Sequence, residues 1–251
     1  MDLGLKGKNV LITGAAKGIG RRIALAAASE GANIALHYRE SEEAAEETAK
    51  EIGEYGVKVS LVKGDISRLE DVRQMKETLD QELGSVVDFI VNNAGWTQMK
   101  SFFKYEPEEW KREVDVCFYG VLNLAHTFMP EMIGKNQGKF INIIGDSART
   151  GDRNLIVSAA ARSGTISFLK SLAQDVGRNN VQCNTVSLGL IDQGALGFNE
   201  ATLDKLIKQY PLKRLGKVDD VTGMILFLLS ESADWITGQV VSVNGGHSML
   251  G

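Results

Sequence analysis

The chain alternates between short apolar, β-branched runs and longer stretches in which apolar residues recur every three or four positions. The runs predict seven buried strands, at residues 9–12, 33–38, 57–62, 86–91, 139–144, 181–187 and 239–243, and the spacing between them predicts helices. This alternation predicts an α/β fold of the Rossmann type, a doubly wound sheet of seven mainly parallel strands with helices on both faces. Chemistry in such a sheet lies beyond the carboxyl ends of its strands.

Composition narrows the class of protein. The 251 residues include only 3 prolines and no linker-like segment, so we expect a single domain over residues 1–251. A net charge of −4 from interspersed acids and bases favours neither nucleic acid nor membrane as a partner. The N-terminus lacks the apolar segment of a signal peptide. Two distant cysteines and three scattered histidines predict a cytoplasmic protein with reduced thiols and no metal site.

Two helical segments have apolar residues on more than one side. They are residues 108–129 and 158–176, and we expect an oligomer to form through them, because each apolar side must be covered. Elsewhere, Ser67 and Glu70 have the spacing of a capping box and predict the start of another helix.

Residues 9–31 read as a strand, a glycine-rich turn and a helix, the first half of a dinucleotide-binding unit. Gly14 permits the tight turn, Gly18 leaves the backbone open to a pyrophosphate, and Gly20 lets the helix approach the strand. The amides of Gly18 and Ile19 at the helix N-terminus would then face the phosphates. The alternative is a purely structural turn.

The ends of the next strands suggest which dinucleotide would bind. No acid ends the second strand, where NAD sites usually have one, whereas Lys17 and Arg39 suit the 2′-phosphate of NADP. The alternative is that both are ordinary surface cations. Asp65 follows the third strand and is expected near the adenine. Asn92, Ala94 and Gly95 follow the fourth strand and are expected near the sugar.

Three motifs together resemble the classical short-chain dehydrogenase/reductase family: TGAAKGIG at 13–20, NNAG at 92–95, and ITGQ with NGG at 236–239 and 244–246. The resemblance covers nearly the whole chain and implies an NAD(P)-dependent oxidoreductase. Residues 92–96 and 145–151 further resemble a branch that oxidises cyclic or aryl-substituted β-hydroxyacyl-CoA thioesters in anaerobic aromatic degradation, such as that of toluene. It includes 2-hydroxycyclohexanecarboxyl-CoA dehydrogenase and 2-[hydroxy(phenyl)methyl]succinyl-CoA dehydrogenase.

The family's mechanism uses a tyrosine phenol, a lysine, a serine and an asparagine, and this chain departs from the pattern at all four places. Gly145 stands at the serine's place, Ser158 at the tyrosine's, Arg162 at the lysine's and Cys117 at the asparagine's. A serine hydroxyl is far less acidic than a phenol, and an arginine stays protonated at neutral pH. We therefore expect no catalytic residues in this chain.

Several neighbouring residues are alternatives that could support weak residual activity. Ser147 is a possible replacement for the missing serine, and Asp146 or Ser158 a possible source of weak activity. Arg149, Arg153 and Arg162 suit a carboxylate or a CoA phosphate, with a solvated loop as the alternative. Further departures from the family's pattern are Arg22, Leu188 and Gln193, the last at the place of a threonine that often touches the nicotinamide carboxamide.

The favoured interpretation is a pseudoenzyme that keeps the fold. It would pair with an intact paralogue, in a heterotetramer, or with itself, and the acyl-CoA substrate would bind through the partner. Its own NAD(P) binding would be weak or absent, with NADP favoured over NAD. The resemblance supplies a precedent, because the 2-[hydroxy(phenyl)methyl]succinyl-CoA dehydrogenase of this branch is similar to a heteromer of one intact and one degenerate short-chain subunit. The alternatives are a stand-alone NADP-dependent oxidoreductase with an atypical site, a non-redox enzyme such as a halohydrin dehalogenase, and a dinucleotide sensor.

Overall fold

A computed structural model describes residues 2–84, 86–194 and 196–250, and its centre is a seven-stranded sheet. The strand order is β3-β2-β1-β4-β5-β6-β9, and every neighbouring pair is parallel. The predicted fold class is therefore confirmed. The strands are β1 (Asn9–Ile12), β2 (Asn33–Tyr38), β3 (Val59–Lys63), β4 (Phe89–Asn92), β5 (Gly138–Gly145), β6 (Val181–Leu188) and β9 (Val240–Val243).

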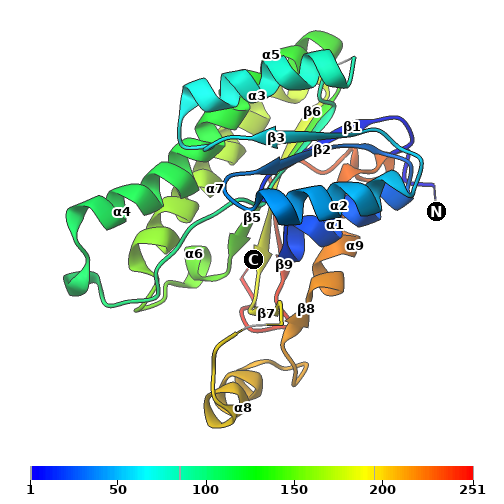
Figure 1. The fold of residues 1–251 in the computed structure, drawn as a ribbon. Coiled ribbons are helices and arrows are strands. Elements are labelled where there is room, and N and C mark those ends of the chain that lie inside the picture. The colour runs from blue at the N-terminus through cyan, green and yellow to red at the C-terminus, as the bar shows by residue number, and fades with distance from the viewer. Residues whose placement is uncertain (1, 85, 195, 251) are drawn as a thin grey trace.

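Three helices cover each face of this sheet (Figure 1). One face carries α1 (Gly18–Ser29), α2 (Glu42–Gly53) and α9 (Val218–Leu229), and the other carries α3 (Leu69–Glu82), α5 (Gly120–Lys135) and α7 (Ile156–Val176). Each face has its own apolar core, with Ile12 in one and Leu11 in the other, because successive strand residues point to opposite faces. Among the described helices, none has the length and apolar character needed to cross a membrane.

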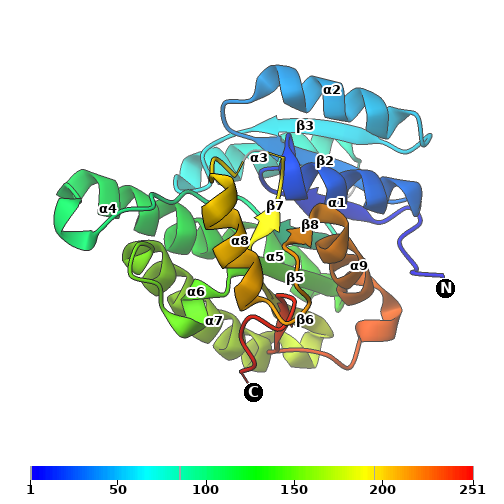
Figure 2. The same ribbon diagram turned by 90° about the horizontal axis from the view of Figure 1, so that it is seen from below.

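Several further elements lie toward the carboxyl ends of the strands. These are α4 (Pro107–Val114), α6 (Ser147–Thr150), α8 (Glu200–Gln209) and the short pair β7 (Ile191–Asp192) and β8 (Gly216–Lys217). Figure 2 shows α8 and β7 in front of this end of the sheet. The segment between β6 and α9 thus faces the region where the sequence predicts chemistry.

Local differences from the sequence prediction have physical causes. The strands predicted at 57–62 and 86–91 begin later, at Val59 and Phe89. The capping box at Ser67 is wrong, because Arg68 is the N-cap of α3 and the Ser67 hydroxyl donates to Asp65 Oδ1 instead (2.6 Å). Both the hydroxyl and the amide of Ser67 are held by the Asp65 carboxylate, so the Ser67 oxygen is not placed to accept from an amide of the first turn of α3.

The predicted helix 108–129 is divided into α4, a π-helical turn at Asp115–Tyr119, and α5. Single π turns inside helices occur frequently at functional sites. Val116 and Met129, on the second apolar side of this segment, are buried in the chain's own core, so they need no partner to cover them.

A chain of buried hydrogen bonds joins the carboxyl ends of three strands to α7. The Thr13 hydroxyl donates to Asn92 Oδ1 (2.8 Å), Asn92 Nδ2 donates to Asn142 Oδ1 (2.9 Å), and Asn142 Nδ2 donates to the Thr165 hydroxyl (2.9 Å). All four side chains are buried. The path crosses β1, β4 and β5, and so fixes the elements on which the glycine-rich turn and α7 depend.

His37 makes a second connection at the same end of the sheet. Its Nδ1 accepts from the Gly14 amide (3.1 Å), and its Nε2 donates to the Gly64 carbonyl (3.0 Å). This pairing requires the neutral imidazole, because Nδ1 must stay unprotonated to accept. Burial lowers the pKa of His37 from 6.5 to about 4.

Acid should therefore destabilise the protein through His37. Between pH 6.5 and about 4 the unfolded chain binds a proton that the folded chain excludes, so stability falls as the pH is lowered. We expect a loss of about 2–3 kcal/mol on going from pH 7 to pH 4.5. Urea unfolding at several pH values measures it, with His37→Gln as the variant that lacks the titrating group. Equal losses in the two proteins would contradict the prediction.

Candidate functional site

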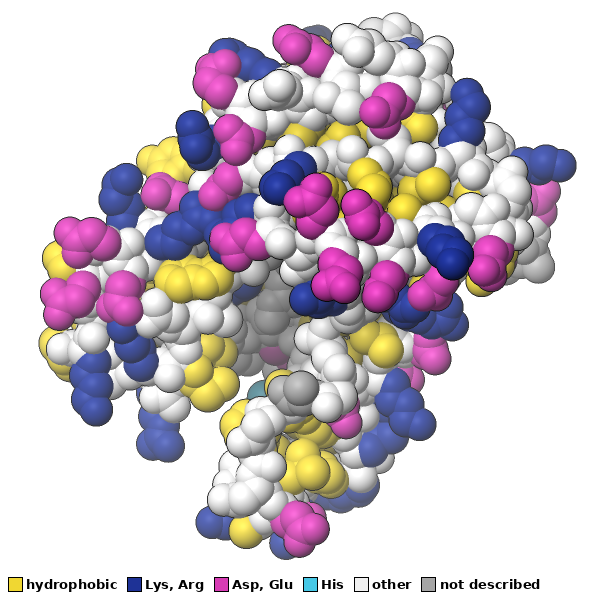
Figure 3. Space-filling model, viewed as in Figure 1, with side chains coloured by type: hydrophobic (Ala, Val, Ile, Leu, Met, Phe, Trp, Pro, Cys, Tyr) yellow, Lys and Arg dark blue, Asp and Glu magenta, His cyan; other side chains and the backbone are white. Residues whose placement is uncertain are grey.

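Two adjoining cavities lie at the carboxyl end of the sheet. The first has a volume of about 250 Å³ and the second about 380 Å³, and both are lined by Gly14, Lys17, Ala94 and Gly95. The space-filling view shows the molecule hollowed here, with Lys and Arg side chains above the hollow (Figure 3). We call the two cavities together the cleft.

The glycine-rich turn forms the floor of the cleft as predicted from the sequence. Gly14 and Gly18 have φ values of +63° and +57°, which favour glycine. A Cβ on Gly20 would lie 2.4 Å from the Gly14 carbonyl oxygen, so only glycine lets α1 approach β1 this closely. The turn thus presents the N-terminus of α1 to the cleft, which is the geometry that binds phosphates.

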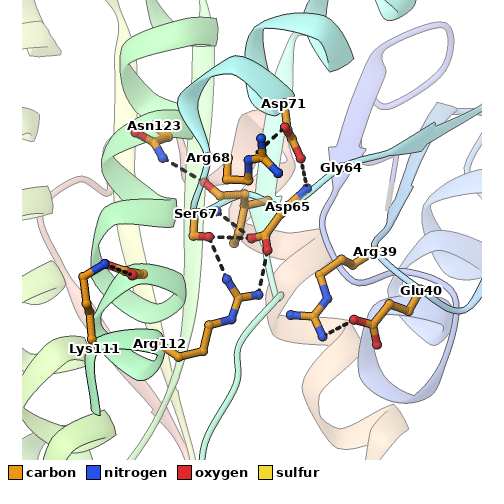
Figure 4. Close-up of polar contacts among 12 residues, drawn as sticks. Arg39, Glu40, Gly64, Asp65, Ser67, Arg68, Asp71, Lys111, Arg112 and Asn123 are labelled. Carbon is orange, nitrogen blue, oxygen red and sulfur yellow. Dashed lines mark hydrogen bonds and ion pairs between the residues drawn. The ribbon is translucent and has the colours of Figure 1, made fainter. Parts of the chain in front are cut away.

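In the first cavity, the predicted cations have different surroundings. Lys17 is exposed. Arg39 Nη2 pairs with Glu40 Oε1 at 2.6 Å. Figure 4 shows Arg39, which follows β2, and Arg112 of α4 directing their guanidinium groups into the same region. The Arg39 pair is solvent-exposed and therefore weak, so a ligand phosphate can compete for the guanidinium.

Asp65 also lines the first cavity, but its carboxylate is already engaged. Arg112 Nη2 donates to Oδ2 (2.7 Å), and the amide and hydroxyl of Ser67 both donate to Oδ1. Partial burial opposes ionisation, but the hydrogen bonds from Ser67 and Arg112 hold the pKa of Asp65 below its ordinary value. An adenine amino group would have to share this carboxylate.

In the second cavity, two side chains of this chain occupy positions beside the turn. Gln193 Oε1 accepts from the Ile19 amide (3.3 Å), and a Cβ on Gly18 would lie 2.1 Å from it. The Gln193 amide oxygen thus holds a place suited to a phosphate oxygen. Arg162 reaches across Gly95, where a Cβ would lie 2.6 Å from its Nη2. Arg162 therefore takes up space beside Gly95 in this half of the cleft.

The structure brings two of the four replaced positions together in the cleft. Gly145 and Arg162 line the second cavity together. Cys117 Sγ donates to the Trp96 carbonyl (3.1 Å), and burial raises the pKa of its thiol although the charge of Arg162 opposes this. The Ser158 hydroxyl is buried and lies 3.4 Å from the Leu155 carbonyl of its own helix. None of these groups has the environment of an activated acid or nucleophile.

The loop after β5 uses its polar groups internally. Asp146 is buried and accepts from the Ser187 hydroxyl (2.6 Å), Asn244 Nδ2 (2.6 Å) and the Ser248 hydroxyl (2.7 Å). Arg149 donates to Ser242 and to the Leu250 carbonyl. The expected roles of Asp146 in residual chemistry and of Arg149 in anion binding are thus not supported, because both side chains hold the C-terminal segment.

Sequence reasoning missed two residues that shape the cleft. Arg112 lines the first cavity with Val116, and their spacing of four places them on one side of a helix, a signal that was available. Asn93 lines the second cavity, and its Nδ2 donates to the carbonyls of Thr13 and Gly14. By contrast Asn92, predicted to contact a cofactor, turns its side chain into the buried network and supports the cleft from below.

Comparisons with known proteins agree with this architecture. The family described as enoyl-(acyl carrier protein) reductase matches residues 14–248. The 3-oxoacyl-[acyl-carrier-protein] reductase of Staphylococcus epidermidis is 33% identical over 246 residues, 96% of this chain and 99% of that protein. The Aquifex aeolicus enzyme of that name is 34% identical over 248 residues, 98% of this chain and 99% of that protein.

A solved structure extends the comparison to the fold. The crystal structure of 3-oxoacyl-[acyl-carrier protein] reductase from Brucella melitensis has a TM-score of 0.91 and 29% identity, covering 98% of this chain and 93% of that one. With the parallel sheet, the glycine-rich turn and the cleft above it, these matches show that the chain belongs to the classical short-chain dehydrogenase/reductase family.

Proposed function

We propose that this chain is a non-catalytic subunit of a heteromeric, NAD(P)-dependent short-chain dehydrogenase that oxidises an aryl- or cycloalkyl-substituted β-hydroxyacyl-CoA. The 2-[hydroxy(phenyl)methyl]succinyl-CoA dehydrogenase type is the favoured one. The partner is an intact paralogue that supplies the acid–base groups and holds the acyl-CoA. The similarity to reductases of acyl-carrier-protein thioesters supports an acyl thioester as the substrate class.

One observation carries this proposal: the described residues that line the second cavity with Gly145 include no tyrosine, and the lysine among them is Lys17 at the start of α1, whereas α7 contributes Arg162. Tyr119 is half exposed on the π turn, and the Tyr210 hydroxyl already accepts from the Leu190 amide (2.8 Å). Removing one acid–base group costs typically about 10²–10⁴-fold in rate. Without the whole proton relay, the chain keeps the fold but lacks the groups that exchange protons during hydride transfer.

The main alternative is a stand-alone NADP-dependent oxidoreductase with an atypical site. Ser147 favours it, because its hydroxyl lies 3.5 Å from the position of a Cβ on Gly145 and is thus near the missing serine's place. A serine hydroxyl there can hold a substrate oxygen but has no phenol to exchange a proton with. A dinucleotide sensor is the second alternative, and it would bind without turnover and without a paralogue.

The cleft fits one half of a nicotinamide dinucleotide better than the other. The glycine-rich turn and the first cavity suit an adenosine with its phosphates once Gln193 leaves the Ile19 amide, whereas Arg162 occupies space on the nicotinamide side. Binding of the full cofactor by this chain is therefore expected to be weak.

If a dinucleotide does bind, NADP(H) should be favoured over NAD(H). Arg39 and Lys17 supply positive charge for a 2′-phosphate. Glu40, the acid just after β2 that lines the first cavity, is paired with Arg39. Calorimetric titration should show tighter NADP(H) binding, reduced about tenfold by Arg39→Ala. Equal affinities for NADP(H) and NAD(H), both unchanged in the Arg39→Ala variant, would contradict this prediction.

The isolated chain should neither oxidise alcohols nor reduce ketones. Assayed alone with NAD or NADP on β-hydroxyacyl-CoA substrates, its turnover should lie at least about 10⁴-fold below that of the complex with the intact paralogue. Activity of the complex should disappear when the paralogue's catalytic tyrosine is changed to Phe.

Ser158→Ala serves as the control within this chain, and it should leave the activity of the complex unchanged. Robust turnover by the isolated chain, abolished by Ser158→Ala, would mean that an altered active site has been mistaken for an absent one.

The oligomer is proposed to form through α5 and α7. Tyr119 is 50% exposed, and Leu122 and Ile166 are half-buried on these helices. Tyr119→Glu should place a charge in the seam and shift light scattering from oligomer to monomer at micromolar concentration. Tyr55→Glu is the matched control, since Tyr55 is equally exposed but lies after α2. A wild-type monomer, with and without the paralogue, would contradict the seam.

A further inference from the structure

The charges that line the cleft do not match those of the whole chain. The protein has a net charge of −4, yet the described residues lining the cleft include four cations, Lys17, Arg39, Arg112 and Arg162, and only two acids. The acids, Glu40 and Asp65, are each paired with an arginine of the first cavity. The cleft therefore retains positive charge at Lys17 and Arg162.

Arg162 is the more informative of these two cations. It is half-buried, and within residues 2–84, 86–194 and 196–250 its guanidinium forms no hydrogen bond or ion pair. No acidic side chain among the described residues lines the second cavity. A partly desolvated guanidinium without a counter-charge is unfavourable, and an anion in this cavity would relieve that cost.

We infer that the cleft binds an adenosine polyphosphate in preference to a nicotinamide dinucleotide. The adenosine would occupy the first cavity, and the first phosphates would meet Lys17 and the N-terminal amides of α1. A further phosphate would reach Arg162. The inference rests on the proposed loss of hydride transfer, because a chain that performed that chemistry would need the nicotinamide where Arg162 lies.

The two ligands differ in the charge that they would present to Arg162. Beyond its pyrophosphate a dinucleotide carries a neutral ribose and a nicotinamide ring that is cationic when oxidised, so it offers Arg162 no anion. A polyphosphate places anionic oxygens there, and guanidinium–phosphate contacts are among the strong, bidentate hydrogen bonds. Free nucleoside triphosphates belong to this ligand class. Coenzyme A does not, because its pyrophosphate is followed by a neutral pantetheine, which offers Arg162 no anion.

Gln193 governs entry to the phosphate site. Its amide oxygen accepts from the Ile19 amide, the donor that a phosphate oxygen would use, and the side chain is exposed and free to swing away. A ligand must displace this hydrogen bond. Removing the side chain should therefore strengthen polyphosphate binding, whereas an ordinary surface glutamine would have no effect.

The test is calorimetric titration of the whole purified chain, without divalent cations, with AMP, ADP, ATP, coenzyme A and NADP. ATP should bind at least tenfold more tightly than AMP, and NADP no more tightly than ADP. Arg162→Gln should weaken ATP about tenfold and change AMP less than twofold. Gln193→Ala should tighten ATP about two- to tenfold.

Arg178→Gln is the matched control, because Arg178 is exposed just after α7 and lies outside the cleft. If the Arg162 variant does not fold, Gln193→Ala alone tests the inference, because an unchanged affinity for ATP in that variant would contradict it. Tighter binding of coenzyme A than of ATP would overturn the inference, because coenzyme A has no phosphate beyond its pyrophosphate to reach Arg162. NADP binding tenfold tighter than ADP, or equal losses of ATP and AMP in Arg162→Gln, would overturn the inference. Turnover by the isolated chain would separately overturn the proposed function.

Discussion

The buried hydrogen bonds that run from Thr13 to Thr165 are the constraint on which the rest of this molecule depends. Thr13 also accepts from the amides of Asn93 and Ala94, so one hydroxyl joins the start of the glycine-rich turn to the loop after β4. Leaving any of these groups buried and unpaired would cost about 1–3 kcal/mol. The cleft is therefore held open by the fold itself, whatever it binds.

This arrangement explains how the family's chemistry can disappear while its architecture stays. The network contains none of the four replaced positions. Cys117 and Ser158 are small and find backbone carbonyls as partners, and Gly145 needs none. Arg162 extends from α7, whose position is fixed by Thr165 one turn away. The replacements at Cys117, Gly145 and Ser158 thus avoid an unsatisfied buried group, and selection on the fold does not oppose these three.

The sequence was sufficient for features that depend on local patterns. Strand periodicity predicted the sheet, and the spacing of Gly14, Gly18 and Gly20 predicted the turn, because those residues act through their own backbone. The pairing of Asp65 with Arg112 was not predictable in the same way. It joins residues 47 positions apart in the sequence, and depends on how α4 packs. The Ser67 cap failed for this reason, since its hydroxyl belongs to that same cluster.

The fate of the other charged groups near the cleft gives Arg162 its significance. Asp146 and Arg149, both candidates for contacts with a substrate, are used to hold the C-terminal segment through Ser248 and the Leu250 carbonyl. Their charges are compensated within the chain. Arg162 has no such compensation, although a neutral side chain at this position would avoid the cost of a half-buried, unpaired guanidinium. The polyphosphate proposal rests on this imbalance: Arg162 is unpaired and, among the described residues, no acid lines its cavity.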